Sequence, residues 1–413
     1  MSDTKRTFAE NAQAAIARTI LNYAQGNDPD VQLPKILHAV DTLVPHDYLV
    51  EQRALFHQVI DNPDNNWMVL LKSLWTDVDD GVRQKVIENF LVNASLLGLR
   101  RQDAAAAKYG CNVPWAMLVD PTSACNLHCT GCWAAEYGDR LNLSFEELDS
   151  IVAQGKELGV FFYLFSGGEP LVRKRDLVRL CEKHDDCAFT AFTNATLIDD
   201  AFAEDLLRVK NFVPAISVEG FEEATDARRG SGTYQAVVRA MGVLRRHRLP
   251  FGVSCCYTHA NAASIGSEAF IEDLIARGAK FAWFFTYMPV GASAPTDLLA
   301  TAEDRAFMYR QIRAFRETKP IFTMDFWNDG EFTQGCIAGG RRYLHINAAG
   351  DVEPCVFAHY ANANIRDVSL LDALRSPIFM AYYEQQPFND NYLRPCPTLD
   401  NAGILADMVD RAG

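Results

Sequence analysis

The chain has 413 residues, of which 49% are hydrophobic and 22% charged, a composition typical of a globular protein with a sizeable core. Acidic residues outnumber basic ones by 53 to 39, and the net charge of −14 argues against broad, sequence-independent binding of nucleic acid. No apolar run reaches the about 20 residues of a membrane-spanning helix, and the polar N-terminus lacks a signal-peptide pattern. The 11 cysteines therefore predict metal or redox chemistry in a cytoplasmic protein rather than disulfides.

The first 110 residues have the apolar spacing of amphipathic helices and lack the alternation typical of strands. The expected helices cover residues 12–24, 49–60, 67–75 and 82–99. The apolar face between Trp67 and Trp75 suits packing against the barrel. It also leaves open a lipid-binding role or a peripheral contact with a membrane surface.

After Val113, short runs rich in β-branched and aromatic residues alternate with helical stretches. The expected strands are residues 115–119, 161–165, 189–192, 212–218, 251–257 and 281–287. The expected helices are residues 144–158, 171–184, 199–209, 234–247, 264–277 and 302–318. These repeats predict an α/β fold with a parallel sheet, curled into a partial (β/α)6 barrel of the TIM type. Active sites of such barrels lie at the C-terminal ends of the strands.

A third segment begins near Asp329. Within it, the short runs at residues 343–346 and 351–356 flank the turn Asn347-Ala-Ala-Gly350 and predict a hairpin. We therefore expect three domains. They are an N-terminal helical domain (residues 1–110), a core barrel (residues 111–330) and a small α+β metal-binding extension (residues 331–413).

Three cysteines, Cys125, Cys129 and Cys132, follow the first expected strand within eight residues of one another. Three thiolates leave one iron of a [4Fe–4S] cluster without a protein ligand, so that a substrate or cofactor can bind there. There are two alternatives. One is a zinc site completed by His128 or a remote cysteine, and the other is a set of cysteines that only pack in the fold.

The spacing Cys-x3-Cys-x2-Cys followed by Trp133 resembles the signature of the radical S-adenosylmethionine (SAM) superfamily, and further motifs follow in the expected order up to Val290. The resemblance implies that the free iron binds SAM and that a flavodoxin- or ferredoxin-type reductant supplies an electron to cleave it. The resulting 5′-deoxyadenosyl radical abstracts hydrogen from a substrate. Cys125, Cys129 and Cys132 are then the catalytic residues of SAM cleavage.

Two later motifs resemble SAM-binding elements of this family. Gly167-Gly168-Glu169 looks like the element that holds the SAM amino group, because glycines admit a close ligand and a carboxylate accepts hydrogen bonds from ammonium. Asn194 lies in the sequence Thr-Asn-Ala-Thr, where the family often has glycine in place of Ala195. A polar cap for the following helix is the alternative interpretation of this second motif.

Three further positions complete the expected SAM site. Ser217 and Glu219 share one face of the fourth strand, an arrangement that suits ribose hydroxyls, although related enzymes often have aspartate in place of Glu219. Arg229, or alternatively Arg228, resembles the arginine that pairs with the SAM carboxylate. Tyr287 ends the sixth strand, where adenine or substrate could stack on its ring.

A second group of cysteines lies in the C-terminal segment. The spacing Cys336-x13-Gly350-x4-Cys355 resembles the element that opens the twitch and SPASM extensions of some radical SAM enzymes, and Cys396 follows it. The resemblance implies at most one auxiliary [4Fe–4S] cluster, because the additional cysteines of a second one are missing. The expected candidates for its fourth ligand are Cys111, His359 and Asp400. Otherwise its open position binds substrate, or the segment is a zinc-stapled or metal-free hairpin domain.

Three functions are compatible with these features. The preferred one is a radical SAM enzyme acting on a lipid or another apolar small molecule, because the expected lumen strands are rich in apolar and aromatic residues. The second is a radical SAM peptide maturase, and the third is a metal-stabilised binding protein without catalysis. The sequence contains no dinucleotide-binding glycine motif, and its N-terminal segment lacks the alternation of a cobalamin-binding domain.

Overall fold

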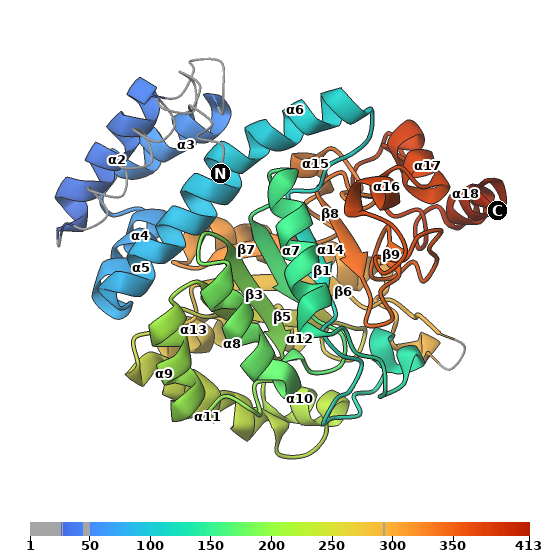
Figure 1. The fold of residues 1–413 in the computed structure, drawn as a ribbon. Coiled ribbons are helices and arrows are strands. Elements are labelled where there is room, and N and C mark those ends of the chain that lie inside the picture. Colours follow the sequence, from blue (N-terminus) through green and yellow to red (C-terminus); the bar gives the residue numbers. More distant parts are fainter. Residues whose placement is uncertain (1–25, 27, 44–49, 292–293) are drawn as a thin grey trace.

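A computed structural model describes residues 26, 28–43, 50–291 and 294–413 (Figure 1). Within these residues, nine strands form one sheet in the order β7-β6-β5-β4-β3-β2-β1-β8-β9. The strands are β1 (Ala116–Val119), β2 (Phe162–Phe165), β3 (Ala188–Thr193), β4 (Phe212–Ser217), β5 (Gly252–Tyr257), β6 (Phe281–Thr286), β7 (Phe322–Asp325), β8 (Tyr343–Ile346) and β9 (Val352–Glu353). The expected parallel sheet is confirmed, since every pair from β7 to β8 is parallel.

The sheet is longer than the six strands expected from the sequence. Strand β7 pairs with β6, and β8 of the C-terminal hairpin pairs in parallel with β1 from Ala116↔Tyr343 to Val119↔Ile346. Only the β8–β9 pair is antiparallel. The C-terminal segment therefore continues the barrel sheet instead of standing apart from it.

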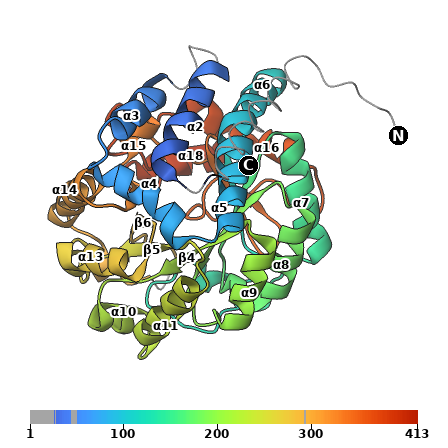
Figure 2. The same cartoon turned by 90° about the vertical axis from the view of Figure 1, so that its left-hand side faces the viewer.

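Helices cover the outer face of the sheet, and Figure 2 shows several of them arranged around the strands. Their bounds are α7 (Phe145–Glu157), α8 (Lys174–Lys183), α9 (Asp200–Val209), α10 (Glu222–Arg229), α11 (Thr233–Arg246), α12 (Ala262–Ile265), α13 (Glu268–Arg277), α14 (Ala302–Thr318) and α15 (Gly330–Thr333). Side chains cap the N-termini of two of the long helices, α7 and α14. Ser144 forms a capping box with Glu147, and Thr301 forms one with Asp304. Both faces of the inner strands are covered, and all four residues of β1 and of β2 are buried.

The N-terminal segment is helical, as expected. It contains α2 (Pro29–Leu43), α3 (Val50–Ile60), α4 (Asn66–Asp77), α5 (Asp80–Val86), a π-helix (Ile87–Gly98) and α6 (Leu99–Tyr109). The expected helix over residues 12–24 lies outside the described residues, and α2 was not expected. The single helix expected over residues 82–99 is instead α5 followed by the π-helix, whose i→i+5 hydrogen bonds place residues four or five apart on one face.

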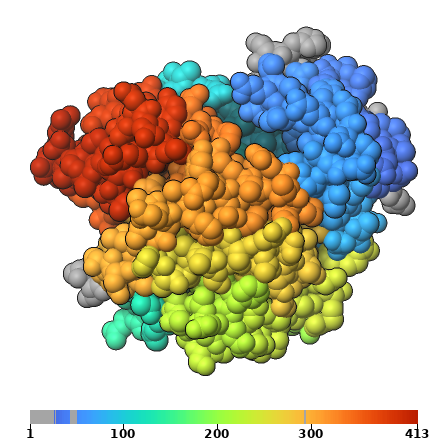
Figure 3. All heavy atoms as spheres, turned by 180° about the vertical axis from the view of Figure 1, so that it is seen from behind, coloured from blue at the N-terminus to red at the C-terminus, as the bar shows by residue number. Residues whose placement is uncertain are grey.

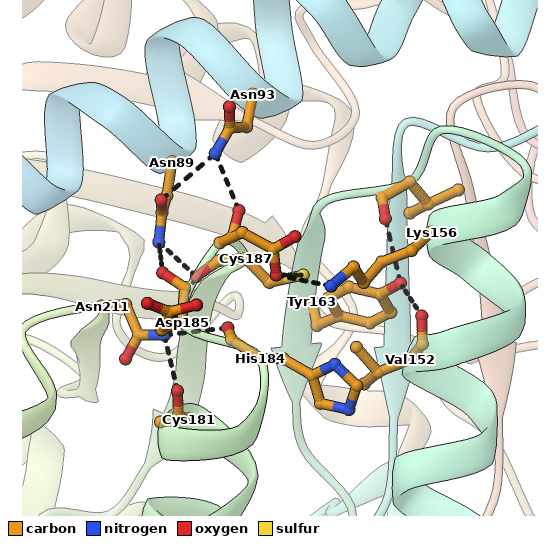
Figure 4. Close-up of polar contacts among 12 residues, drawn as sticks. Asn89, Asn93, Val152, Lys156, Tyr163, Cys181, His184, Asp185, Cys187 and Asn211 are labelled. Atoms are coloured by element: carbon orange, nitrogen blue, oxygen red, sulfur yellow. Dashed lines mark hydrogen bonds and ion pairs between the residues drawn. The ribbon is translucent and has the colours of Figure 1, made fainter. Parts of the chain in front are cut away.

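Polar side chains of the π-helix donate hydrogen bonds to backbone carbonyls of the barrel (Figure 4). The amide of Asn89 donates to the carbonyl oxygens of Asp185 at 2.8 Å and Cys187 at 2.7 Å. Asn93 donates to the Asp186 carbonyl at 2.9 Å, and Gln102 of α6 donates to the Gly159 carbonyl at 2.8 Å. Since these loops lead into β2 and β3, the helices cover the end of the barrel opposite to the C-terminal ends of the strands.

The apolar face of α4 is used inside the protein. Met68 and Trp75 are buried in one cluster with Leu33 of α2, so this part of the face packs on another N-terminal helix instead of the barrel. The ring of Trp67 contacts Phe322 of β7, with centroids 5.6 Å apart. None of the described helices combines the length and apolarity needed to cross a bilayer.

The C-terminal segment adds α16 (Leu370–Leu374), α17 (Pro377–Gln385) and α18 (Ala402–Ala412) beside the hairpin. Seen from behind, this segment (red) and the N-terminal helices (blue) lie at opposite sides of the upper half of the molecule (Figure 3). The C-terminal segment and the N-terminal helices therefore pack against different parts of the barrel.

The contacts of Asn89 lead to a stability prediction. Replacing it with alanine leaves two carbonyl oxygens without this donor, one of them buried, and should lower the free energy of unfolding by about 1–3 kcal/mol. Urea denaturation measures this change. The control Asn62→Ala removes an exposed amide in a turn and should change stability by less than about 0.5 kcal/mol. Equal stability of the two variants would contradict the docking role of Asn89.

Candidate functional site

A cavity of about 180 Å³ opens at the C-terminal ends of the barrel strands. Loops after β1, β2, β3 and β4 reach it together with residues at the ends of β5 and β6. Eight of the nine residues expected from the first cysteine motif and the SAM-like motifs that follow β2, β3 and β4 line it: Cys125, Cys129, Cys132, Gly167, Gly168, Glu169, Asn194 and Ser217. Arg229 and Tyr287 line it as well, and the ninth motif residue, Glu219, does not.

The three cysteines of the first motif are free and half-buried in the loop that follows β1. Burial raises the pKa of the Cys125 and Cys129 thiols, and the guanidinium of Arg229 partly offsets this at Cys129. Gly131 has a φ of +67°, and a Cβ there would lie 2.7 Å from the hydroxyl of Tyr287. Glycine thus allows the loop to turn and to pack directly against the Tyr287 ring.

Among the residues that the structure describes, no three Cys, His, Asp or Glu side chains are grouped as ligands of one metal ion. The ligands of an iron–sulfur cluster bind different iron atoms and need not converge on a single point.

The Gly-Gly-Glu segment packs against the cysteine loop. A Cβ on Gly167, whose φ is +97°, would lie 2.5 Å from the carbonyl oxygen of Thr122, and a Cβ on Gly168 would lie 2.2 Å from that of Ala124. The backbone N–H groups of Gly168 and Glu169 donate to these same two carbonyls. The glycines are therefore required by backbone packing as well as by access to the cavity.

Glu169 is buried, and its carboxylate is held by three donors. The Thr193 hydroxyl donates at 2.7 Å, the Asn194 N–H at 2.7 Å and the Leu171 N–H at 2.9 Å. Burial raises the pKa of Glu169, and these donors offset part of the rise by favouring the ionised form. Next to it, Ala195 has a φ of 61°, a left-handed conformation that explains why glycine suits this position in the related motif.

The expectation for Glu219 differs from what the structure shows. Its carboxylate is fully buried beneath the cavity, where Oε1 accepts from Arg228 at 2.5 Å and from Arg229 at 2.6 Å. Oε2 accepts from the backbone N–H of Cys256 at 3.0 Å. The carboxylate is therefore occupied by protein donors, and it positions two arginines instead of facing a ribose.

Both arginines line the cavity, so the structure does not choose between Arg228 and Arg229. Burial would raise the pKa of Glu219, but the two guanidinium groups outweigh it and hold this pKa below its usual value. Two cations against one anion leave one net positive charge on this side of the cavity. Because the Arg228 Nε is buried without a partner among the described residues, the site suits an anionic ligand group.

Hydroxyl and aromatic groups line the rest of the cavity. Ser217 and Ser254 face each other with their hydroxyl oxygens 3.0 Å apart. The hydroxyl of Tyr287 is buried and has no partner within the described part of the chain. Phe192 and Phe285 add an apolar wall with an edge-to-face contact of 5.6 Å between ring centroids.

The second group of cysteines comes together in a separate, smaller cavity. Cys336, Cys355 and Cys396 all line it. None of the three expected candidates for a fourth ligand does: Cys111, His359 and Asp400 are absent from its lining. His359 stacks on Tyr137, and Asp400 pairs with Arg305.

Aromatic rings separate the two cavities, a feature that the sequence analysis did not identify. Phe285 and Phe357 line the first cavity, whereas Phe326 and Trp327 line the second. Phe326 lies 5.5 Å from Phe285, and Trp327 lies 5.7 Å from Phe357, measured between ring centroids. Phe357 belongs to the C-terminal extension, which therefore contributes to the first cavity.

A buried network links this extension to the barrel. The imidazole of His345 lies between the Asp120 carboxylate at 2.9 Å and the Glu353 carboxylate at 2.7 Å. Asp120 also accepts from the hydroxyl of Ser166 at 2.7 Å, and Glu353 accepts from Tyr137 at 3.0 Å. Burial alone would lower the pKa of His345, but the two carboxylates outweigh it and raise this pKa to about 10.

The network leads to a second stability prediction. His345→Leu leaves two buried carboxylates without their cation and should lower the free energy of unfolding by about 3–5 kcal/mol near pH 7. Since the folded-state pKa is raised, the cation stabilises fully below about pH 6.5 and this stabilisation is lost as the pH rises through about 10. Denaturant titrations at several pH values should show the difference from the parent protein narrowing toward pH 10. A constant difference would show that the charge on His345 does not matter.

The donor set of the first cavity fits the cofactors that the sequence resemblance implies. Three free thiols can each bind one iron, and the unpartnered Arg228 Nε and Tyr287 hydroxyl are available to a polar ligand. The second cavity offers three more thiols. Soft thiolate ligands of this kind suit iron–sulfur clusters.

Comparison with known families and sequences identifies the same regions. Residues 119–261 match the model of the radical SAM superfamily, and residues 336–398 match that of an iron–sulfur cluster-binding domain named SPASM. A protein of Archaeoglobus fulgidus is 36% identical over 32% of this chain and 32% of its own length. An AdoMet-dependent heme synthase of Nitratidesulfovibrio vulgaris is 23% identical over 67% of this chain and 82% of its own length. The mycofactocin maturase MftC of Mycolicibacterium smegmatis is 28% identical over 60% of this chain and 66% of its own length.

Solved structures share the fold. Streptococcus suis SuiB bound to the precursor peptide SuiA has a TM-score of 0.56 and 18% identity over 67% of this chain and 68% of its own. Native anSMEcpe with bound AdoMet and the Cp18Cys peptide has a TM-score of 0.53 and 20% identity over 65% of this chain and 81% of its own. Each of the two matched family models contains one of the two groups of cysteines. This chain is a radical SAM enzyme with a C-terminal SPASM extension, and its cofactors are SAM and [4Fe–4S] clusters.

Proposed function

We propose that this chain is a radical SAM peptide maturase. The observation that carries the proposal is the composite wall of the first cavity, in which Phe357 of the C-terminal extension faces the barrel residues. A substrate at this cavity therefore contacts both parts of the chain. Two fold relatives with a peptide bound, SuiB and anSMEcpe, and the maturase MftC support a peptide as the substrate.

The residues of the first cavity have separate roles in this proposal. Cys125, Cys129 and Cys132 hold the cluster. Arg228 and Arg229 bind the SAM carboxylate with their surplus positive charge. Gly167, Gly168 and Glu169 would hold the SAM amino group. Asn194 and Ser217 offer hydrogen bonds to the sugar, and Tyr287 offers its ring and hydroxyl to adenine or substrate.

When bound, the cluster and SAM together supply the electron and the 5′-deoxyadenosyl radical that removes a hydrogen atom from the substrate. The protein orients the reacting groups and excludes water from them. Phe192, Phe285 and Phe357 form the apolar part of the wall. Glu219 acts from below, because it fixes the position of both arginines. A flavodoxin- or ferredoxin-type protein is the proposed reductant.

The relatives favour the peptide interpretation over the apolar small molecule that the sequence analysis preferred. The apolar lumen that suggested a lipid is largely accounted for by ring-to-ring packing, such as the contact of Trp283 with Phe285. The heme synthase relative shows that a small-molecule substrate has to be tested directly.

The assignment of the first cluster predicts the behaviour of one pair of variants. Cys129→Ala should abolish formation of 5′-deoxyadenosine by the anaerobically reconstituted enzyme, because only two thiolates remain for the cluster. Chromatography of the nucleoside product and the iron content measure the loss. The control Cys255→Ala removes a fully buried thiol of β5 that does not line the cavity, and it should retain SAM cleavage. SAM cleavage by Cys129→Ala at the parent rate would refute the assignment.

Deuterium transfer tests the substrate class. The reconstituted enzyme with SAM and dithionite is incubated with the peptide fraction, or separately with the lipid and porphyrin fractions, of source cells grown in deuterated water. Mass spectrometry should find deuterium in 5′-deoxyadenosine only with the peptide fraction. Deuterium transfer confined to the lipid or porphyrin fraction would overturn the maturase proposal and leave the radical SAM assignment intact.

A further inference from the structure

The second cavity holds more polar side chains than its three cysteines. Its lining includes Tyr382 of α17 and Trp327, which lies between β7 and α15. The Tyr382 hydroxyl and the Trp327 indole N–H are both buried, with 0% and 3% of these residues exposed. Neither group has a hydrogen-bond partner among the described residues.

Such groups are unusual in a folded protein. A buried donor that loses water without gaining an acceptor costs about 1–3 kcal/mol, and most buried donors are therefore paired. Two unpaired donors in the wall of one small cavity indicate that their acceptor belongs to what the cavity holds. The thiols of Cys336, Cys355 and Cys396 in the same lining point to an iron–sulfur cluster, because this segment matches the SPASM family model.

Packing holds Tyr382 in place. A Cβ on Gly339, whose φ is +62°, would lie 2.4 Å from the Cβ of Tyr382, so only glycine admits the tyrosine here. The ring of Phe388 contacts the Tyr382 ring edge-on, with centroids 5.2 Å apart and planes at 90°. The hydroxyl therefore has a defined direction and little freedom to seek another acceptor.

The chemistry of both groups suits donation to sulfur. A tyrosine hydroxyl is protonated at neutral pH and can donate a hydrogen bond. An indole N–H such as that of Trp327 is a donor only. A third phenol, Tyr343, already lies 2.8 Å from the sulfur of Cys355. All three groups are thus suited to donate to sulfur atoms that carry negative charge.

We propose that Tyr382 and Trp327 donate hydrogen bonds to the sulfur atoms of the auxiliary [4Fe–4S] cluster and thereby raise its reduction potential. A hydrogen bond to cluster sulfur withdraws negative charge, so the reduced and more negative state gains more from it than the oxidised state. Both side chains are positioning residues that act through the cluster and do not contact substrate.

The test measures the midpoint potential of the auxiliary cluster in the full-length chain. All variants carry Cys129→Ala, so that the auxiliary cluster alone gives the signal. The midpoint potentials of Tyr382→Phe and Trp327→Phe are then compared with that of the Cys129→Ala parent by redox titration monitored with electron paramagnetic resonance. Each should shift the potential to more negative values, and the double variant should shift it further. Resonance Raman spectra of the parent should show iron–sulfur stretches that move in deuterated water, and this shift should diminish in both variants.

Tyr163→Phe is the matched control, because it removes a fully buried hydroxyl that donates to the carbonyls of Val152 and Val160 (Figure 4). Its potential should equal that of the Cys129→Ala parent. An unchanged potential in Tyr382→Phe and Trp327→Phe would overturn the proposal. Loss of iron from Tyr382→Phe would also overturn it, since the phenol would then be a ligand. The measurement does not use substrate, so failure of the maturase proposal leaves it interpretable.

Discussion

The imidazole of His345, held between the carboxylates of Asp120 and Glu353, is the interaction on which the arrangement of the two cysteine sites depends. Asp120 directly follows β1 and leads into the first cysteine loop, whereas His345 and Glu353 belong to β8 and β9 of the extension. Two buried anions that share one buried cation tolerate little relative movement, because any separation leaves a charge without its partner in a medium of low polarity. The network therefore works with the β1–β8 ladder to keep the SPASM extension in register with the barrel.

Charge balance also shapes the first cavity. Glu219 lies under the floor and neutralises one of two arginines, so that the other charge remains available at the surface of the cavity. A single arginine without Glu219 would lack a fixed direction, and a full ion pair without the second arginine would present no net charge. The arrangement gives an anionic ligand group a preorganised partner at the end of β4, beside the cysteine loop.

Aromatic rings give the two cavities separate environments. Phe326 and Trp327 close the second cavity on the side where Phe285 and Phe357 close the first. A layer of packed rings therefore lies between the two cavities.

The sequence by itself determined the elements whose signal is local. Strand and helix alternation predicted β1 to β6. The close spacing of Cys125, Cys129 and Cys132 predicted the first cysteine group, and the resemblance to a known spacing pattern predicted the second. What depends on distant contacts was decided only by the tertiary structure. Strand β7 is short and half-exposed, the π-helix differs from an α-helix only in hydrogen bonding, and the pairing of β8 with β1 joins residues more than 200 positions apart. Strand alternation predicted that Ser217 and Glu219 share one face, but Glu219 lies beyond the end of β4, and its carboxylate is occupied by two arginines of α10. The donors Tyr382 and Trp327 carry no motif, since their role arises from where packing directs a hydroxyl and an indole, and a one-dimensional pattern does not record direction.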